Sequence, residues 1–248
     1  MDLRNNKKIP AYESSINVKH LGVKQPDSVS FPVDTSSLFR IRFLNPYKNY
    51  NYYYKGQVHA HSKRSDGSLK PKNVLKYYKN RGYFFISLTD HDDELECWQI
   101  FKDPKVPNIV YAPGEEGGKG HKTHFLELNL TKCPPSGEFL LKKWNYHTVE
   151  QGGLTVAPHS LSSEHTWSQN QLFDLEWLTG LEIKNNAGYA QLWDRLLKGD
   201  RQRWGFCVDD FHSKANVNHG WIMVNSEDKN PNRFDLFANI KNGNFYSV

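Results

Sequence analysis

The sequence predicts an α/β protein in which β-strands and α-helices alternate around a barrel. Short apolar runs with strand character alternate with amphipathic helical patterns, which is typical of parallel β/α units. About seven or eight such units follow the N-terminal stretch, and this number favours a barrel over an open sheet. Histidines and carboxylates recur where the predicted strands end, as they do in barrels that carry a functional site at one rim.

Composition limits the class of protein. The chain has 248 residues, of which 38% are hydrophobic, enough for one large packed domain or two small ones. Its net charge is +5, and the basic residues are scattered rather than gathered into a block. The three cysteines form no CxxC pair, so we expect neither a disulfide framework nor a thiolate zinc site. We find no signal-peptide pattern and no long apolar run, and we expect a cytoplasmic protein that does not enter a membrane.

Residues 1–54 are interpreted as an N-terminal extension, and residues 55–248 as the main domain. The extension is polar and irregular, apart from a strand-like alternation at 37–43 and a Tyr/Asn-rich connector at 45–56. Stacked tyrosines occur in carbohydrate and nucleic-acid sites. Aromatic residues more often serve packing, so we expect the connector to pack against the main domain.

The elements of the main domain follow one another from residue 57. We expect strands at 57–61, 83–89, 108–112, 123–130, 153–158, 181–185, 205–209, 221–224 and 244–248. The second of these is almost continuously apolar, as in a parallel strand buried on both faces. We expect helices at 71–81, 189–199 and 233–243. The first helix begins at Pro71, and Val74, Leu75 and Tyr78 share one of its faces.

Polar side chains gather at the ends of these strands. The first strand ends in His59 and His61, which share a face because side chains alternate along a strand. Two imidazoles on one face can bind the same metal ion. The other candidates are Asp66, Asp90, His91, Asp92, Asp93, Glu115, Glu116, His124, His159, Asp209, Asp210 and His212. Six of the eleven histidines belong to this set, and scattered histidines would not return repeatedly to one rim.

Imidazoles and carboxylates without cysteine are donors that suit divalent Zn, Mn or Fe. The candidates are too many for one tetrahedral ion, so we expect two or three ions that share a bridging carboxylate. Clustered ions polarise a phosphoryl oxygen and lower the pKa of bound water to about 7, which supplies a hydroxide nucleophile at neutral pH. The sequence has no GxSxG elbow, Walker loop or GxGxxG after a strand, so it does not indicate those chemistries.

In this order the motifs resemble those of the PHP domains, named for polymerase and histidinol phosphatase. The matching segments are KGQVHAHSKRSDG, FFISLTDHDD, APGEE, THFLELN, VAPHS and GFCVDDFH, and GWIMV and NGNFYSV resemble the family's closing segments. The resemblance covers about residues 55–248. It implies a distorted seven-stranded, TIM-like β/α barrel with a metal cluster, which agrees with the alternation of predicted strands and helices.

The resemblance also implies a ligand role for nine side chains around three ions. The first ion would be held by His59, His61 and Asp210. The second would be held by His124 and His159, with Glu116 bridging the first and the second. The third would be held by Asp66, His91 and His212.

The resemblance also implies that Asp90 would orient a ligand. A leaving alkoxide needs a proton or a metal, and His212 or His159 could assist it. The family usually shows a single glutamate where this chain has Glu115 and Glu116; the spacing favours Glu116 as the bridge, with Glu115 as the alternative. The segment VAPHS reverses the family's more usual His-Pro order.

The predicted function is a metal-dependent phosphoesterase that acts on a small phosphorylated substrate. A hydroxide held between the ions would attack phosphorus in line while the ions neutralise the equatorial oxygens. Side chains that could bind a second phosphate or another anion are Lys63, Arg64, Lys184 and Arg201. Each of these is more often a plain surface charge.

Three alternatives remain at this point. Some PHP-type hydrolases whose opening motif is similar to YKGxxHxHSxxSDG cleave carboxyl or carbamate esters. A 3′–5′ exonuclease similar to the polymerase-associated PHP domains is less favoured, because no polymerase follows and the basic residues form no stripe. A catalytically silent, metal-stabilised binding module is the least favoured, because every expected ligand type is present.

Overall fold

The structure of the protein is a computed structural model. It describes residues 52–92, 96–118, 123–135, 140–160, 167–185, 187–188, 190–199 and 201–248. The expected strand at 37–43, Asp93 and nearly all of the expected extension and connector lie outside the described residues. No helix in the described part is both long and apolar enough to cross a membrane.

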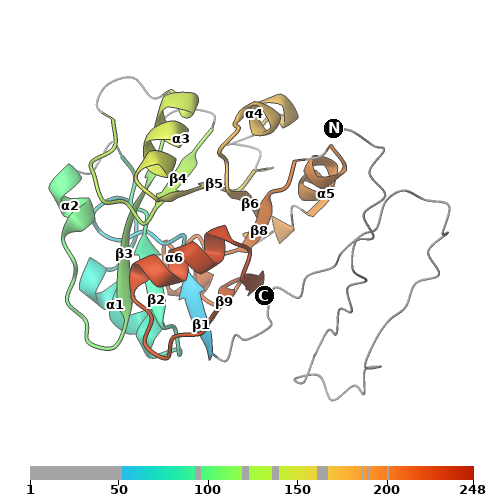
Figure 1. The fold of residues 1–248 in the computed structure, drawn as a ribbon. Helices are drawn as coiled ribbons and strands as arrows, with labels where there is room; N and C mark the ends of the chain where they lie inside the picture. The colour runs from blue at the N-terminus through green and yellow to red at the C-terminus, as the bar shows by residue number, and fades with distance from the viewer. Residues whose placement is uncertain are drawn as a thin grey trace, which may run out of the picture. The chain divides into compact units, whose positions relative to one another are not determined.

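The described residues form a mixed α/β fold around one ten-stranded sheet (Figure 1). The strands are β1 (Tyr52–Gln57), β2 (Phe85–Leu88), β3 (Val110–Gly117), β4 (Phe125–Leu128), β5 (Leu154–Ala157), β6 (Gly180–Asn185), β7 (Ala187–Gly188), β8 (Trp204–Cys207), β9 (Ile222–Ser226) and β10 (Phe245–Ser247). The helices are α1 (Pro71–Lys79), α2 (Cys97–Phe101), α3 (Leu141–Glu150), α4 (Gln169–Asp174), α5 (Ala190–Lys198) and α6 (Arg233–Lys241).

The sheet is nearly closed into a barrel. Neighbouring strands run in the order β10-β9-β1-β2-β3-β4-β5-β6-β7, and β8 pairs with β6. Ser247 in β10 reaches β8, where its hydroxyl donates to the Gly205 carbonyl at 2.6 Å and accepts from the Cys207 amide at 3.3 Å. These two hydrogen bonds connect β10, at one end of the strand order, to β8, which pairs with β6 near the other end.

Strand directions differ from those of the TIM-like barrel that the sequence predicted. The pairs β1–β2, β2–β3, β5–β6 and β6–β8 are parallel. The pairs β3–β4, β4–β5, β1–β9, β9–β10 and β6–β7 are antiparallel. Only seven residues separate the end of β3 from the start of β4, too few for a crossover helix, so these two strands pair as antiparallel neighbours. Within the described residues there are thus ten strands of mixed direction where seven were expected.

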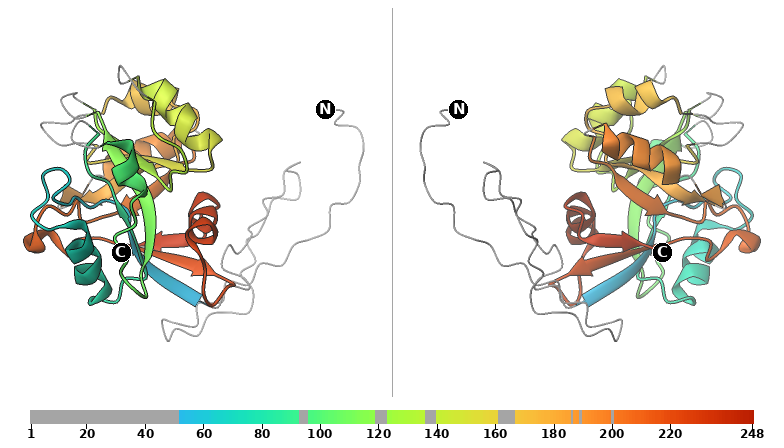
Figure 2. Two further views of the ribbon diagram at one scale, coloured as in Figure 1. Left: turned by 90° about the vertical axis from the view of Figure 1, so that its left-hand side faces the viewer. Right: turned by 90° about the vertical axis from the view of Figure 1, so that its right-hand side faces the viewer.

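The helices cover the sheet with the apolar faces that their sequences provide. In α1, Val74, Leu75 and Tyr78 are fully buried, as predicted from their spacing. Helix α6 packs alongside β9 (Figure 2) and buries Leu236 and Ile240 in the same apolar cluster as the strands. Full burial of one such aliphatic side chain contributes about 2 kcal/mol to stability.

The first strand begins earlier than predicted. Tyr52, Tyr53 and Tyr54, which were assigned to the connector, belong to β1 and pair with β9, since aromatic residues suit a pleated, half-buried surface. His59 and His61 therefore lie just beyond the strand, in an extended segment tied to the chain after β8 by a bridge between Ala60 and Phe211. Val58 and Ala60 are both fully buried, but they belong to two different apolar clusters, so this segment does not keep the strict alternation that was expected. The Nε2 atoms of His59 and His61 nevertheless lie 3.1 Å apart.

One expectation about the cysteines was wrong. Cys97 and Cys133 form a disulfide, with their Cα atoms 5.5 Å apart and a sequence separation of 36. Cys97 begins α2 and Cys133 follows β4; the two segments meet because β2, β3 and β4 are neighbours in the sheet. Sequence spacing does not reveal this proximity.

Candidate metal centre

The predicted ligands come together at one edge of the sheet. His59 and His61 follow β1, His91 follows β2 and His159 follows β5, so these four lie beyond the carboxyl ends of parallel strands. His124 precedes β4, and because β4 runs antiparallel to β3 its beginning lies at the same edge. Both the parallel strands and the antiparallel strand β4 therefore contribute side chains to this one rim.

The first group of donors consists of His59, His61, Glu116 and Asp210. The Nε2 atoms of both histidines lie 3.1 Å from Glu116 Oε2. The same nitrogens lie 3.1 and 3.3 Å from Asp210 Oδ1. The two imidazole nitrogens are themselves 3.1 Å apart. Two nitrogens and two carboxylate oxygens thus surround one point.

Glu116 connects this group to a second one. Its Oε1 lies 3.0 Å from His124 Nδ1 and 2.8 Å from His159 Nε2, while its Oε2 faces the first group. His91, Glu116 and His124 also form a group of donors close enough to hold one ion. Glu116, rather than Glu115, is therefore the carboxylate that lies between the histidines.

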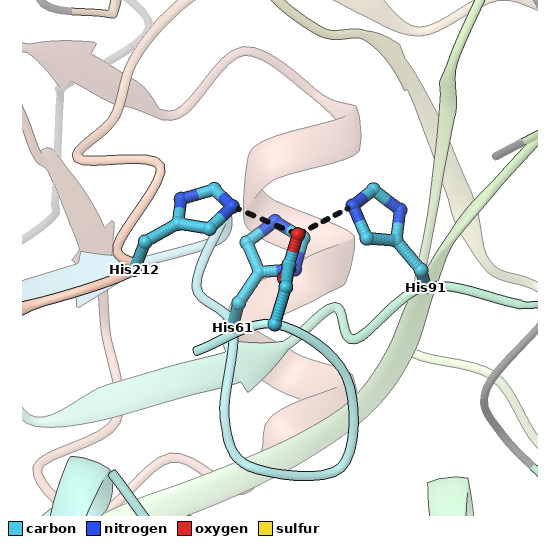
Figure 3. Close-up of side chains that lie close together, drawn as sticks. His61, His91 and His212 are labelled. Atoms are coloured by element: carbon cyan, nitrogen blue, oxygen red, sulfur yellow. Dashed lines mark ion pairs between the residues drawn. The ribbon is translucent and has the colours of Figure 1, made fainter. Parts of the chain in front are cut away.

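A third group lies beside the first and contains His61, Asp66, His91 and His212. Figure 3 shows the three histidine rings around one point, with dashed lines marking the ion pairs of Asp66 with His91 and His212, each at 3.4 Å. Asp66 and His212 are each 39% exposed, whereas His61 is fully buried. The third group is thus the open side of the centre.

The electrostatics of the centre are those of a strongly coupled cluster. Burial lowers the pKa of His61, but its hydrogen bonds to Asp210 and Glu116 outweigh burial and raise that pKa to about 9. Burial likewise opposes a charge on His59, yet the nearby carboxylates raise its pKa well above the usual value. Burial would raise the pKa of Glu116, but the histidines around it hold that pKa well below the usual value.

This donor set fits divalent cations. In the metal-free protein the raised pKa values of His59 and His61 place protons between the imidazoles and the carboxylates, where they balance negative charge. A cation at the same point would balance that charge while receiving the nitrogen and oxygen lone pairs directly. Imidazole and carboxylate donors suit Zn, Mn or Fe.

Asp90 supports the loop that carries Asp66. Its carboxylate accepts from the Ser62 amide at 2.5 Å, the Ser62 hydroxyl at 2.9 Å and the Ser65 hydroxyl at 3.1 Å. A side chain at Gly67 would not fit here, because its Cβ would lie 2.5 Å from the carbonyl carbon of His61. The motif SKRSDG therefore folds back tightly on the histidine segment.

The ligand segments adopt an uncommon backbone conformation at two positions. His159 has a φ of 28° and Asp210 a φ of 48°, in the left-handed region that residues other than glycine seldom adopt. Strain of this kind persists only where the surrounding contacts impose it, and it is concentrated at functional sites.

One buried carboxylate of the centre was missed by the sequence analysis. Glu182 lies in β6, is fully buried, and contacts both His59 and the backbone of His159. The available signal was a charged residue inside the otherwise apolar segment LEI of an expected strand. Charged side chains are almost never fully buried unless they are paired.

The four predicted anion-binding residues lie apart from these contacts. Lys63, Lys184 and Arg201 are exposed. Arg64 donates from Nη2 to the Lys102 carbonyl at 2.8 Å, which ties the loop after His61 to the end of α2. Among the contacts of the described residues, none of these four side chains reaches a carboxylate of the centre.

The chain has a PHP-like fold, as its motifs predicted. A two-domain protein from Bacteroides vulgatus that contains a predicted PHP-like metal-dependent phosphoesterase superposes with a TM-score of 0.62 and 16% identity, over 81% of this chain and 65% of that one. PsfC from Pseudomonas syringae superposes with a TM-score of 0.58 and 13% identity, over 79% and 91% of the two chains.

The lesion-specific endonuclease Q of Pyrococcus furiosus also superposes, with a TM-score of 0.60 and 12% identity, over 77% of this chain and 56% of that one. This chain thus spans less than two thirds of both the Bacteroides protein and the endonuclease. An uncharacterised protein of Methanocaldococcus jannaschii is 28% identical over 145 residues, which cover 53% of this chain and 81% of that protein. No family model matches the sequence.

Proposed function

We propose that the protein is a metal-dependent phosphoesterase that acts on a small phosphorylated substrate. The observation that carries the proposal is Glu116, a buried carboxylate whose two oxygens face two different groups of histidines. One carboxylate shared in this way suits a pair of neighbouring cations. The PHP-like fold, shared with a protein that contains a predicted metal-dependent phosphoesterase, supports the same class of activity.

The proposed ligands would form three neighbouring metal sites. His59, His61 and Asp210 would hold the first ion, His124 and His159 the second with Glu116 between them, and Asp66, His91 and His212 a third. Bound divalent ions would polarise the phosphoryl oxygens and lower the pKa of a water molecule. We favour Zn, Mn or Fe, because the donors are imidazoles and carboxylates.

With only the first and the second ion bound, His212 is free of metal and is then best suited to proton transfer to the leaving group. Its Nδ1 lies 3.0 Å from the Asp210 carbonyl, so a proton on Nδ1 is held by that oxygen and Nε2 faces Asp66 at 3.4 Å. Partial exposure lets this imidazole meet substrate and solvent, whereas His159 is buried against Glu116. We therefore favour His212 over His159 for this role.

Two adjacent glutamates provide the test. We expect the purified protein to contain two or three divalent ions by elemental analysis and to hydrolyse p-nitrophenyl phosphate until it is treated with a chelator. Glu116→Gln should lose bound metal and nearly all turnover, whereas Glu115→Gln, the matched control on the same strand, should keep both. Equal activity of Glu116→Gln and the wild type would overturn the proposal.

A nuclease is the second candidate, because endonuclease Q shares the fold and the third donor group is open to solvent. An endonuclease Q structure contains a 27-mer duplex with an abasic lesion at the active site. We would assay a duplex with one abasic site, and single-stranded DNA, with Mn²⁺ present. Cleavage of DNA without hydrolysis of small phosphate esters would favour this candidate over the first. An aryl ester in the same panel tests carboxyl-ester hydrolysis.

A further inference from the structure

We infer that Glu182 is a positioning residue that fixes three of the proposed metal ligands at once: His59, His159 and, through Asn185, Asp210. The inference rests on the proposed metal centre but not on the identity of its substrate. It concerns a side chain that is buried beneath the centre and lies between ligands from three different strands.

Each oxygen of Glu182 is engaged by the segments that carry the ligands. Oε1 lies 2.6 Å from His59 Nδ1. Oε2 accepts from the His159 amide at 2.6 Å and from Asn185 Nδ2 at 3.0 Å. The carboxylate is fully buried, and a buried charge is tolerated only where hydrogen bonds replace its water. All of its described donors come from the centre or its support.

The contact with His59 determines which nitrogen faces the donors of the first group. A proton on Nδ1 is held by Glu182, so Nε2 is the nitrogen that lies 3.1 Å from both Glu116 and Asp210. A carboxylate that holds the far nitrogen of a ligating imidazole fixes its tautomer and ring orientation and increases its basicity. Glu182 therefore prepares His59 to donate its Nε2 lone pair.

The contact with His159 acts on the backbone. His159 has a φ of 28°, which is unfavourable for a residue with a side chain. The Glu182 carboxylate accepts the amide hydrogen of this residue and so holds the turn that directs the imidazole to Glu116, 2.8 Å away. The left-handed turn after β5 is thereby coupled to a side chain in β6.

The third connection runs through Asn185. Its Nδ2 donates to Glu182 Oε2 at 3.0 Å and to Asp210 Oδ2 at 3.1 Å. Because Oδ2 of Asp210 is held by this amide, Oδ1 is the oxygen that faces His59 and His61. Asp210 also has a positive φ, 48°, so both strained ligand positions are linked to the same carboxylate.

The test compares Glu182→Gln with Glu127→Gln. Glu127 is a suitable control because it is also a fully buried barrel glutamate, and burial raises its pKa to about 7 although hydrogen bonds with Glu115 and Thr148 oppose that rise. An amide therefore resembles its protonated form. The glutamine in Glu182→Gln cannot accept from all three donors at once, because its side-chain amide has one accepting oxygen and one nitrogen that only donates.

The probe is Co²⁺ added to the metal-free full-length protein, with the visible absorption spectrum and the binding isotherm as readouts. We expect Glu182→Gln to weaken Co²⁺ binding by about 10- to 100-fold and to change the spectrum, since supporting partners of metal ligands have effects of this size. Glu127→Gln should match the wild type in both. Thermal unfolding of each metal-free variant reports whether it folds.

Asn185→Ala is the second variant, in case Glu182→Gln does not fold. It removes the hydrogen bonds from Asn185 to Glu182 and to Asp210, but leaves the contacts of Glu182 with His59 and His159, so we expect weaker Co²⁺ binding and a changed spectrum with Glu182 still in place. Wild-type affinity and spectrum in a folded Glu182→Gln, or in Asn185→Ala if the first variant does not fold, would overturn the inference. A wild-type protein that binds Co²⁺ but hydrolyses no phosphate ester would overturn the proposed function alone.

Discussion

At the scale of single residues, the centre depends on which atom of each side chain faces inward. Glu116 can connect two groups of histidines because its two oxygens face different histidines. The neighbouring Glu115 cannot, because it faces the opposite side of β3 and interacts with Glu127. The sequence predicted most of these residues, since HxH and DDFH are local motifs at strand ends. Glu182 was missed by the sequence analysis, because a charged residue within an apolar strand does not reveal partners that come from distant segments.

Removal of one fully buried imidazole should abolish activity without unfolding the protein. His61 touches Glu116 and Asp210 and belongs to two donor groups, so His61→Ala should lower kcat/KM for p-nitrophenyl phosphate by at least about 100-fold. His147→Ala is the control, because that histidine lies in the last turn of α3, away from the centre. Near wild-type turnover of His61→Ala would show that the ligand assignment is wrong.

The raised histidine pKa values predict that metal binding releases protons. His61, with a pKa of about 9, carries a proton at pH 7.5 in the metal-free protein, and it must lose this proton to become a ligand. Titration calorimetry with Zn²⁺ in buffers of different ionisation enthalpy should therefore show a net release of about one proton or more. Binding without any buffer dependence would contradict the prediction.

The raised pKa of His61 also determines how the stability of the metal-free protein changes with pH. The pKa of His61 is raised from 6.5 to about 9, so its stabilising contribution in the metal-free protein is complete below pH 6.5 and is lost as the pH rises through about 9. Thermal unfolding of the metal-free protein should show decreasing stability across this interval. The metal-loaded protein should lose less, because there the cation takes the place of the proton.

At the scale of elements, the predicted bounds were good where the apolar periodicity of the segment determines the structure. They were poorer where pairing with a neighbouring strand determines it. Helix α1 and strands β2, β5 and β6 lie close to their predicted positions, because their apolar residues face a core on one or both sides. Strand β1 was placed too late, since a run of tyrosines resembles a connector until β9 pairs with it. The antiparallel pairing of β4 also depends on its neighbours.

The disulfide between α2 and the segment after β4 should contribute measurably to stability. A crosslink that closes a loop of 36 residues restricts the unfolded chain, which corresponds to about 3–4 kcal/mol. Cys133→Ser should lower the free energy of unfolding in urea by this amount. A reducing agent should lower the wild-type value to that of the variant and leave the variant unchanged. A wild type that is insensitive to reduction would contradict the prediction.

At the scale of the whole described domain, the mixed sheet explains how one rim gathers so many ligands. Parallel strands bring their carboxyl ends to the rim, and the antiparallel strand β4 brings its beginning there, so His124 joins histidines from β1, β2 and β5. The sequence predicted this convergence through the order of its motifs. It could not predict the closure through Ser247, which depends on contacts between β8 and β10.

The convergence itself can be observed directly. Crystals of the protein soaked in Mn²⁺ should give anomalous difference peaks at two or more points, one among His59, His61, Glu116 and Asp210 and another beside Glu116 among its other histidines, each within about 2.0–2.4 Å of the donor atoms. Absence of any peak at this rim, with the same side chains directed away from one another, would contradict the account.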